Sequence, residues 1–291
     1  MNRRIERYFA EGLAIEYSIV GEGAPILVMH GGHSNCHEEF GYKALVENGF
    51  MIITPTRPGY GGTSKEIGEN LSKACMYYAK LLDHLKLEKV HLLGISAGGA
   101  SAIYFASKYP DLVWSLTLQS AVTKTWLTQE DKKYKAARLL FHPRVEKLTW
   151  RLISSINNVF PGFIFKQMFP SFSNLKYAEA KEKINKSDVE AIRKMNNRQR
   201  SGYGFMIDLE QVNELTDNNL KSITCPTLIM HSKFDGSVPI DHAYFAHQQI
   251  ASSKLCLLDS WGHLIWLGNS SDETDEKINT FLGSYLLNAV K

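Results

Sequence analysis

Short apolar runs alternate with helical periods along most of this 291-residue chain, and this alternation limits the folds that are open to it. A strand buried in a parallel sheet has a short continuous apolar run, whereas an amphipathic helix repeats its apolar residues every three or four positions. Strands are expected at 13–20, 26–29, 51–54, 90–93, 113–118, 227–230 and 255–258. Helices are expected at 70–86, 97–108, 240–250 and 273–289. This order predicts right-handed crossovers and a mostly parallel sheet flanked by helices, which is an α/β fold.

The alternation stops between residues 123 and 222, where the sequence shows no convincing buried strand. Amphipathic runs at 130–156 and 178–199 predict helices, and an aromatic, Pro-containing stretch separates them. We therefore expect a helical cap at 123–222, inserted between two parts of one core at 1–122 and 223–291. Single domains usually have about 50–250 residues, so one core with an insertion fits this length better than two full enzyme domains.

Charge is unevenly divided between these parts. The whole chain carries 33 Lys and Arg against 30 Asp and Glu, and a net charge of +3 is too small to indicate a nucleic-acid partner. Eighteen Lys and Arg and eleven Asp and Glu fall within 123–222, so the cap has a net charge of +7 and the core one of −4. Because these cations are interspersed with acids, we expect solvated outer helix faces; attraction of anionic substrates or lipid headgroups is the alternative.

Several classes of protein and site are disfavoured by what the sequence lacks. No run approaches the roughly 18–20 continuous apolar residues of a membrane-spanning helix, and no signal-peptide pattern follows the basic N-terminus. No metal site is expected, because His30, His33 and His37 lack helical spacing and nearby cysteine pairs. The wide spacing of the cysteines favours reduced thiols in a cytoplasmic protein. The cysteines are Cys36, Cys75, Cys225 and Cys256.

One short motif falls between a predicted strand and a predicted helix. Gly94-Ile95-Ser96-Ala97-Gly98 begins where strand 90–93 ends. A Gly-x-Ser-x-Gly string arises by chance in about one chain in ten of this length, so its position carries the argument. A tight strand-to-helix turn lifts the serine hydroxyl above the sheet and leaves no room for side chains two residues before and after it. The helix N-terminus favours negative charge there, so Ser96 is the predicted nucleophile.

A serine nucleophile needs a histidine base and a carboxylate that orients the base. His263 lies on the loop after the last predicted strand and is the predicted base; capping of a turn is the structural alternative. Asp235 follows the preceding predicted strand and is the predicted acid, which gives the chain order Ser, Asp, His. Asp208, within the insertion, and Asp259, next to the last strand, are the alternatives.

Backbone donors for a developing oxyanion are expected from a glycine-containing loop. His30-Gly31-Gly32-His33 directly follows strand 26–29, and glycine lets the backbone approach a substrate closely. We assign the N–H groups of Gly32 and Ala97 as the donors, with the N–H of His33 as the alternative to that of Gly32. A plain strand-ending turn is the structural alternative for this loop.

Together these motifs resemble those of the α/β-hydrolase superfamily, and the likeness covers essentially the whole chain. It rests on His30-Gly31-Gly32, Arg57-Pro-Gly-Tyr-Gly-Gly-Thr-Ser64, Gly94 to Gly98, Asp235 with Val238-Pro239, and Gly262-His263. The resemblance implies a hydrolase that needs no cofactor and acts through an acyl-enzyme. It also implies that 123–222 corresponds to the helical cap of that family.

The chain departs from the family pattern at a few positions. Thr56 stands where many members have Asp, and Ser232 where many have Gly, but neither touches the expected chemistry. Ser96 argues against the members that use an Asp nucleophile, such as haloalkane dehalogenases and epoxide hydrolases. Ala97 argues against proline iminopeptidases, which usually have Trp at this place in the motif.

The predicted reaction is hydrolysis of a small molecule, most simply an ester with an apolar acyl or alcohol group. Substrate contacts are predicted at His33, Trp126, Phe165 and Trp266. Carbon–carbon bond hydrolysis and aminopeptidase activity use the same triad and are alternatives. A ligand-sensing receptor with slow turnover is the alternative from another class. A lipase working at an interface is favoured by the basic insertion, but the sequence shows no obvious exposed amphipathic anchor.

Overall fold

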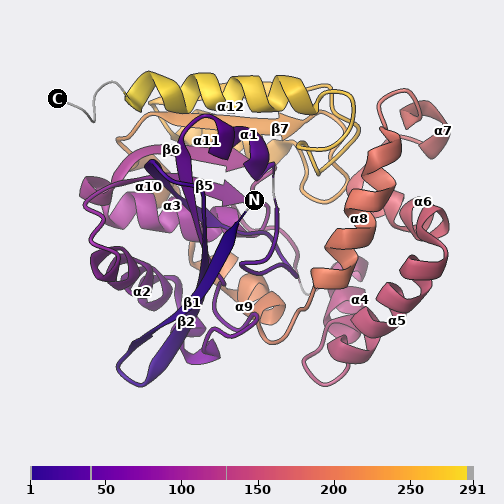
Figure 1. Cartoon of the computed structure of the whole chain (residues 1–291), viewed down its shortest axis with the longest axis horizontal. Helices are drawn as coiled ribbons and strands as arrows, with labels where there is room; N and C mark the ends of the chain where they lie inside the picture. Colours follow the sequence, from indigo (N-terminus) through magenta and orange to yellow (C-terminus); the bar gives the residue numbers. More distant parts are fainter. Residues whose placement is uncertain (1, 40, 129, 287–291) are drawn as a thin grey trace.

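The structure is a computed structural model that describes residues 2–39, 41–128 and 130–286. Its centre is an eight-stranded sheet in the order β1-β2-β4-β3-β5-β6-β7-β8 (Figure 1). The strands are β1 (Arg3–Ala10), β2 (Leu13–Val20), β3 (Ala24–Met29), β4 (Phe50–Pro55), β5 (Val90–Ile95), β6 (Val113–Gln119), β7 (Thr227–Ser232) and β8 (Ser253–Leu258). β2 pairs antiparallel with β1 and β4, and the other neighbouring strands pair parallel, which confirms the predicted mostly parallel sheet.

The edge strand β1 is an element that the apolar pattern does not predict. Its charged residues, among them Arg4, Glu6 and Arg7, interrupt any apolar run, yet it pairs with β2 from Arg3 to Ala10. Charged side chains are common on edge strands because they discourage pairing with other chains. The sequence does not predict this strand, because it is defined by its backbone pairing with β2 and has no apolar run that would indicate burial.

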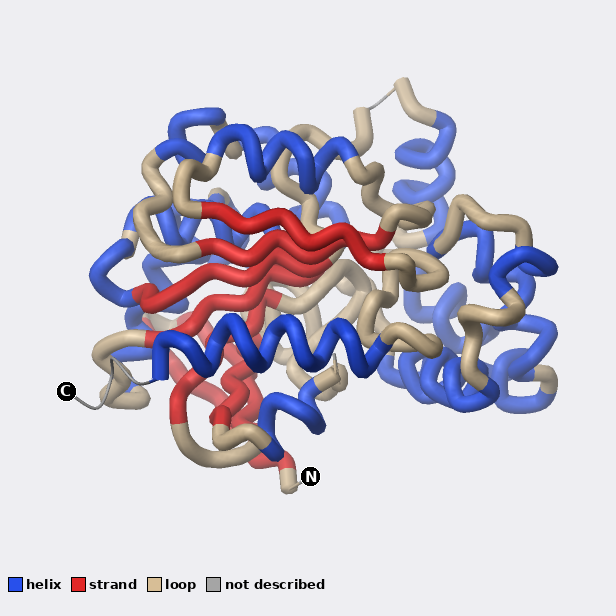
Figure 2. The backbone as a smooth tube through the Cα atoms, turned by 90° about the horizontal axis from the view of Figure 1, so that it is seen from above, coloured by secondary structure: helices blue, strands red, loops and turns tan. Residues whose placement is uncertain are grey.

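Two layers of helices cover the sheet, because neighbouring residues of each strand point to opposite faces. The core helices are α1 (Tyr42–Glu47), α2 (Leu71–His84), α3 (Gly98–Lys108), α10 (Asp217–Lys221), α11 (Asp241–Gln249) and α12 (Ser271–Leu286). Leu27 and Leu92 pack with α2, α3, α10 and α11 on one face. Val28 and Leu93 pack with α1 and α12 on the other. Figure 2 shows the strands as a twisted layer between these helices.

The segment between β6 and β7 is helical, as expected from the sequence. Its helices are α4 (Lys132–Leu140), α5 (Glu146–Val159), α6 (Pro161–Phe172), α7 (Tyr177–Ala180), α8 (Lys186–Arg198) and α9 (Gly204–Gln211). The aromatic stretch that the sequence places between helices is itself helix α6. Pro161 suits its first turn, where the missing N–H has no helical partner, and Phe165 and Phe169 are buried one turn apart.

The insertion stands beside the carboxyl edge of the sheet (Figure 1). α10 packs against α3 and α11 of the core, so the chain returns to the core before the predicted boundary at 223. The predicted helix at 273–289 corresponds to α12, and residues 287–289 of that prediction lie outside the described residues. Among the helices that the structure describes, none combines the length and apolar character that crossing a membrane requires. All four cysteines are free.

Candidate active site

Ser96 occupies the sharp turn between β5 and α3. Its φ of 51° lies in the left-handed region, which residues other than glycine rarely adopt. The Ser96 N–H donates to the Gln119 carbonyl (3.0 Å), and the Ser96 carbonyl accepts from the N–H groups of Val122 (2.8 Å) and Gly99 (2.9 Å). The end of β6 therefore holds this strained residue on both sides, and fixes its hydroxyl at the carboxyl edge of the sheet.

Glycines flank this turn because their neighbours leave no space for a side chain. A Cβ on Gly94 would lie 2.6 Å from the Cβ of Ala102, which is far too close. A Cβ on Gly98 would overlap the carbonyl oxygens of Met29 and His30. The close approach of α3 to the end of β3 thus explains the Gly-x-Ser-x-Gly spacing in physical terms.

His263 lies within hydrogen-bond distance of the other two residues predicted as a triad, Ser96 and Asp235. The Nε2 atom of His263 is 3.0 Å from Ser96 Oγ, and its Nδ1 atom is 2.7 Å from Asp235 Oδ2. Because Nδ1–H donates to the carboxylate, Nε2 is left as the acceptor for the serine proton. Residues that are 167 positions apart in sequence, Ser96 and His263, thus meet at one point above the sheet.

Asp235 is 2% exposed and is held in place by backbone donors. Its Oδ1 atom accepts from the N–H groups of Ser237 and Val238, each at 2.8 Å. Burial by itself would raise the pKa of Asp235, but the charge and hydrogen bond of His263 outweigh it and hold that pKa below its usual value. His231 lies beside the same carboxylate, and burial lowers its pKa, which favours the neutral ring. Asp235 is therefore an ionised partner for His263 at neutral pH.

The two alternative acids have other partners. Both terminal NH2 groups of the Arg57 guanidinium donate to the Asp208 carboxylate, with 2.8 Å between Nη2 and Oδ2. The Tyr60 hydroxyl also donates to Asp208 Oδ2, at 2.6 Å. Asp259 pairs at the surface with the Nζ atom of Lys183 at 2.5 Å. The structure thus brings Asp235, and neither alternative, to His263.

Arg57 fixes the start of the oxyanion loop, which we define as residues 30–33. Its backbone N–H donates to His30 Nε2 (2.8 Å), and its Nε–H donates to the His30 carbonyl (2.6 Å). Burial and the charge of Arg57 hold the pKa of His30 well below its usual value, so the ring is neutral and can accept this bond. Because Arg57 is itself held by Asp208 on α9, the insertion helps to position the oxyanion loop.

The N–H groups of Gly32 and Ala97 form no hydrogen bond to protein within the residues that the structure describes. A Cβ on Gly32 would lie 3.8 Å from the Cβ of Ala97, so these two residues lie side by side next to Ser96. The N–H of His33, the alternative donor, is directed at the Tyr60 hydroxyl at 3.3 Å. The geometry therefore favours Gly32 over His33 as the donor from the oxyanion loop.

His33 instead belongs to an aromatic cluster contributed mainly by the insertion. The rings of Phe141 and Phe205 each lie 4.2 Å from the His33 ring, and Trp150 lies at 5.4 Å. The hydroxyl of Ser201 accepts from Trp150 Nε1 and is 2.8 Å from His33 Nδ1. Burial lowers the pKa of His33 to about 3, so this cluster carries no charge from histidine at neutral pH. Sequence reasoning missed Phe141 and Phe205, since helical aromatics are usually core.

The other predicted substrate contacts, Trp126, Phe165 and Trp266, pack against different parts of the site. Trp126 packs against Val238 and donates from Nε1 to the Ser237 carbonyl at 3.0 Å, so it borders the loop of the acid. Phe165 is buried in a cluster that joins the insertion to Trp261 on the loop of His263, with 5.9 Å between the two rings, and Trp266 packs between that cluster and the α12 side of the core. A role in substrate binding stays a prediction for all four residues.

The end of α6 and the residues after it hold both loops of the triad, and we name residues 172–174 the cap clasp. The Phe172 carbonyl accepts from the N–H groups of His263 (2.8 Å) and Gly236 (3.0 Å). The Asn174 side chain donates to the Asp235 carbonyl at 2.6 Å. These bonds join parts of the chain that are about sixty to ninety residues apart, so no local sequence pattern signals them.

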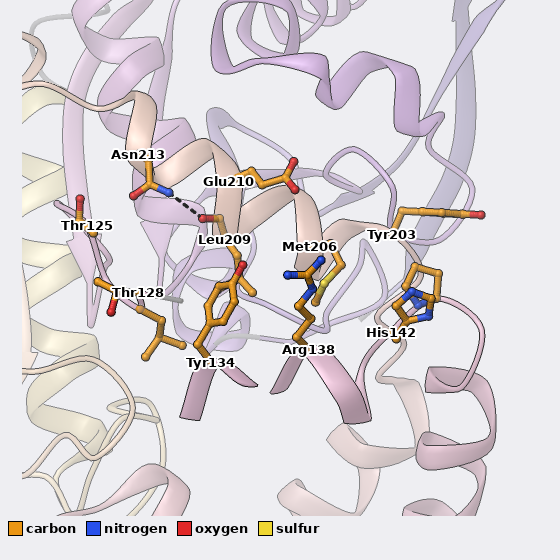
Figure 3. Close-up of a pocket in the computed structure, with 12 residues that line it drawn as sticks. Thr125, Thr128, Tyr134, Arg138, His142, Tyr203, Met206, Leu209, Glu210 and Asn213 are labelled. Atoms are coloured by element: carbon orange, nitrogen blue, oxygen red, sulfur yellow. Dashed lines mark hydrogen bonds between the residues drawn. The ribbon is translucent and has the colours of Figure 1, made fainter. Parts of the chain in front are cut away.

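A cavity of about 560 Å³ lies between α4 and α9, outside the aromatic cluster (Figure 3). Tyr134 and Arg138 of α4 face Met206 and Glu210 of α9 across it. None of the residues that line it belongs to the triad. Phe205, next to Met206 in α9, reaches the oxyanion loop, so α9 lies between this cavity and that loop.

One group of potential metal ligands occurs within the described residues. Glu16, Cys36 and His37 bring a carboxylate oxygen, a thiol and a ring nitrogen within 4.8 Å of one another. The Glu16 carboxylate already accepts from the Gly62 N–H at 3.0 Å and lies 3.6 Å from Arg7. Burial raises the pKa of the Cys36 thiol to about 11, which favours the protonated form. Protein donors thus already satisfy the carboxylate, and the absence of a metal site stays a prediction.

Comparison with known proteins identifies the family of this chain. The model of the alpha/beta hydrolase fold family matches residues 24–269. The chain belongs to the α/β-hydrolase fold family. This α/β-hydrolase is 57% identical over 284 residues to the uncharacterized hydrolase YcgS of Bacillus subtilis (strain 168), covering 98% of this chain and 100% of that protein.

Two further relatives extend the comparison. A proline iminopeptidase of Clostridioides difficile (strain 630) is 31% identical over 132 residues, or 42% of this α/β-hydrolase and 45% of that protein. Among solved structures, an alpha/beta hydrolase fold protein from Nakamurella multipartita has a TM-score of 0.82 and 25% identity, covering 95% of this chain and 98% of that one. The family and the names of its relatives support hydrolase activity.

Proposed function

We propose that this α/β-hydrolase cleaves a small ester with an apolar acyl or alcohol group through an acyl-enzyme on Ser96. One observation carries the proposal, namely the hydrogen-bond chain from Ser96 Oγ through His263 to Asp235. The N–H groups of Gly32 and Ala97 beside it have no protein acceptor among the described residues. A nucleophile, a base, an orienting acid and two backbone donors are the groups that acyl transfer requires.

In the proposed reaction, Ser96 Oγ attacks the carbonyl carbon while its proton passes to His263 Nε2. The Asp235 carboxylate stabilises the imidazolium, and the N–H groups of Gly32 and Ala97 bind the oxyanion. Collapse of the tetrahedral intermediate transfers the Nε2 proton to the leaving alkoxide. Water then enters, gives a proton to Nε2 and attacks the acyl carbon, and a second collapse releases the acid and restores Ser96.

The surroundings of the oxyanion loop support an apolar substrate group. Phe205 approaches the position of Gly32, and Phe141 and the neutral His33 ring extend the same cluster. Burial lowers the pKa of His33 to about 3, so at neutral pH this ring carries no positive charge that would attract a carboxylate substrate. The small residue Ala97 leaves the space beside the serine open to such a group.

Fluorophosphonate labelling and an ester screen test this proposal together. The wild type is expected to be labelled and to hydrolyse p-nitrophenyl esters, with a preference that depends on acyl length. Ser96→Ala should lose labelling and lower kcat by about 10⁴-fold or more, because the nucleophile is gone. Ser72→Ala, which changes an exposed serine on α2, is the matched control and should behave as wild type.

Other outcomes would contradict parts of the proposal. Labelling that persists in Ser96→Ala would overturn the assigned nucleophile. If peptide substrates of aminopeptidases or vinylogous diketones are turned over faster than any ester, the assigned triad would stand but the proposed substrate class would be wrong. Single turnover without a steady state, together with ligand-dependent binding of a partner protein, would instead favour the sensor.

A further inference from the structure

The outer surface of the insertion exposes an unusual number of apolar side chains. Nine of the thirteen exposed large apolar side chains in the described residues lie between positions 139 and 163. We name this set the outer apolar face; its members are Leu139, Leu140, Val145, Leu148, Leu152, Ile156, Val159, Phe160 and Phe163. Single exposed apolar residues need no explanation, but a contiguous set marks a surface that contacts something else.

Helix α5 shows how the set is organised. Leu148, Leu152, Ile156 and Val159 follow one another at spacings of four, four and three, which places them along one side of the helix. Leu148 is 69% exposed and Val159 67%. The opposite side of the same helix is buried at Trp150 and packs toward α8. In Figure 1, α5 and α6 lie on the side of the insertion that faces away from the sheet.

Cations border this apolar stripe on one side. Arg144 precedes α5, and Lys147 and Arg151 lie on it one turn apart, beside the stripe in the helical projection. All three are exposed, and none forms an ion pair with any other residue that the structure describes. The insertion carries eighteen Lys and Arg against eleven Asp and Glu, a net charge of +7. An exposed apolar stripe next to free cations is the pattern of a helix that lies in a lipid interface.

We propose that the outer apolar face docks on an anionic lipid surface, with α5 lying along the interface and Arg144, Lys147 and Arg151 reaching the headgroups. Charge separates this occupant from a second copy of the chain. A symmetric dimer through the same face would bring two insertions of +7 together, whereas anionic headgroups attract them. The exposed stripe on α5 is an amphipathic face that the sequence pattern did not reveal.

Two members of the outer apolar face, Leu139 and Leu140, alternate in sequence with residues of the cavity between α4 and α9. Arg138 and His142 line the cavity, and the exposed Leu139 and Leu140 stand between them in sequence. The proposal concerns binding of a surface and does not depend on the hydrolase reaction.

Flotation with lipid vesicles tests the proposal. The probes are vesicles of phosphatidylcholine alone and vesicles that contain one quarter phosphatidylglycerol. At low salt we expect the wild type to bind the anionic vesicles at least about tenfold better than the neutral ones, and to lose most of this difference when salt shortens the Debye length to about 3 Å. Leu148→Glu with Leu152→Glu should weaken binding to anionic vesicles by at least about tenfold.

The matched control places the same charge change on exposed apolar residues elsewhere. Ile5 and Phe9 are 43% and 66% exposed on the edge strand β1, and Ile5→Glu with Phe9→Glu should bind vesicles as the wild type does, apart from a small uniform loss. A second variant, Lys147→Glu with Arg151→Glu, keeps the apolar stripe and should lose the preference for anionic vesicles. Circular dichroism checks that each variant is folded.

Three results would overturn the proposal. The first is a wild type that does not float with anionic vesicles. The second is a Leu148→Glu and Leu152→Glu variant that floats as well as the wild type. The third is a wild-type dimer by light scattering that the same variant dissociates, without vesicle binding, which would assign the face to a second copy of this chain.

Discussion

The oxyanion loop and the two loops of the triad are both held by the insertion, but through different chemistry. Asp208 on α9 holds Arg57 by a buried ion pair, and Arg57 holds the oxyanion loop. The cap clasp holds the loops of Asp235 and His263 by backbone carbonyl and amide bonds. The oxyanion side therefore depends on charged and titratable groups, and the triad side depends on close backbone packing.

The insertion therefore helps to position the groups of the proposed active site and is not only a cover over them. An ion pair that loses one partner leaves an uncompensated buried charge, whereas a backbone contact fails only when the chain is pushed apart. The two sides should thus respond to different substitutions. Charge removal should damage the support of the oxyanion side, and steric insertion should damage that of the triad side.

The largest effect is expected from Asp208→Asn. The substitution keeps the shape of the side chain but leaves Arg57, 2% exposed, without its counter-charge, and should lower the free energy of unfolding by about 3–5 kcal/mol. Arg57 would then hold His30 less rigidly, and the oxyanion loop would be less well positioned. We therefore expect kcat for ester hydrolysis to fall by about tenfold to a hundredfold. Urea unfolding and steady-state kinetics measure the two effects.

Asp259→Asn is the control for that experiment. It removes the same charge from a surface pair with Lys183, in which the Asp259 side chain is 61% exposed, and should change stability by less than about 1 kcal/mol. Equal losses in the two variants would show that the buried pair has no special role. An Asp208→Asn variant with wild-type stability and unchanged kcat would show that the insertion does not position the oxyanion loop.

The next effect is expected from Gly262→Ala on the triad side. A Cβ at this position would overlap the Phe172 carbonyl of the cap clasp, so the backbone next to His263 must move. We expect a loss of about 1–3 kcal/mol in unfolding free energy, and a fall in kcat with little change in KM, because His263 shifts relative to Ser96. Chemical denaturation and ester kinetics provide both readouts.

Gly162→Ala serves as the control, because nothing lies within 4 Å of a Cβ at that position in α6. Alanine in an exposed helix should stabilise by up to about 1 kcal/mol relative to glycine. If Gly262→Ala has the same unfolding free energy and the same kcat for ester hydrolysis as Gly162→Ala, the cap clasp does not restrict the position of His263 as proposed.

The same contrast explains what the sequence could and could not predict. The strands of the parallel sheet and the residues of the predicted triad follow from local signals. Leu92 and Leu93 are part of an apolar run, and Ser96 sits between glycines at the end of that run. Such signals depend on residues a few positions apart, and sequence reasoning captures them.

The remaining parts depend on contacts between distant residues. Asp208 could be considered as an acid, but its pairing with Arg57, 151 positions away, appears only in the folded chain. The cap clasp is hard to recognise in the sequence, because its bonds come from the Phe172 carbonyl and from the Asn174 side chain to a distant backbone carbonyl. Helix α6 was missed for another reason, since its two prolines and its aromatics outweighed the helical spacing of Phe165 and Phe169.

The smallest expected effect is a change in how the free energy of unfolding depends on pH, and it concerns His33 on the oxyanion side. Burial and the charge of Arg57 outweigh the nearby carboxylate of Glu146 and lower the pKa of His33 to about 3, against about 6.5 in an unfolded chain. Between these values the unfolded state binds a proton that the folded state does not. Stability therefore rises with pH through this window and falls as the solution is acidified. His33 should contribute up to about 1.4 kcal/mol per pH unit to that slope.

His33→Asn isolates this contribution, because asparagine tolerates the φ of 61° at this position and does not titrate. The slope of unfolding free energy between about pH 4.5 and 6 should be shallower in the variant by about 1 kcal/mol per pH unit. Trp150→Phe removes the other hydrogen bond to Ser201 without removing a titratable group, so it should lower stability and leave the slope unchanged. A slope that is the same in His33→Asn and in the wild type would mean that His33 is protonated in the folded protein. The oxyanion side would then carry an extra positive charge, and its contrast with the uncharged clasp would be greater in acid than at neutral pH.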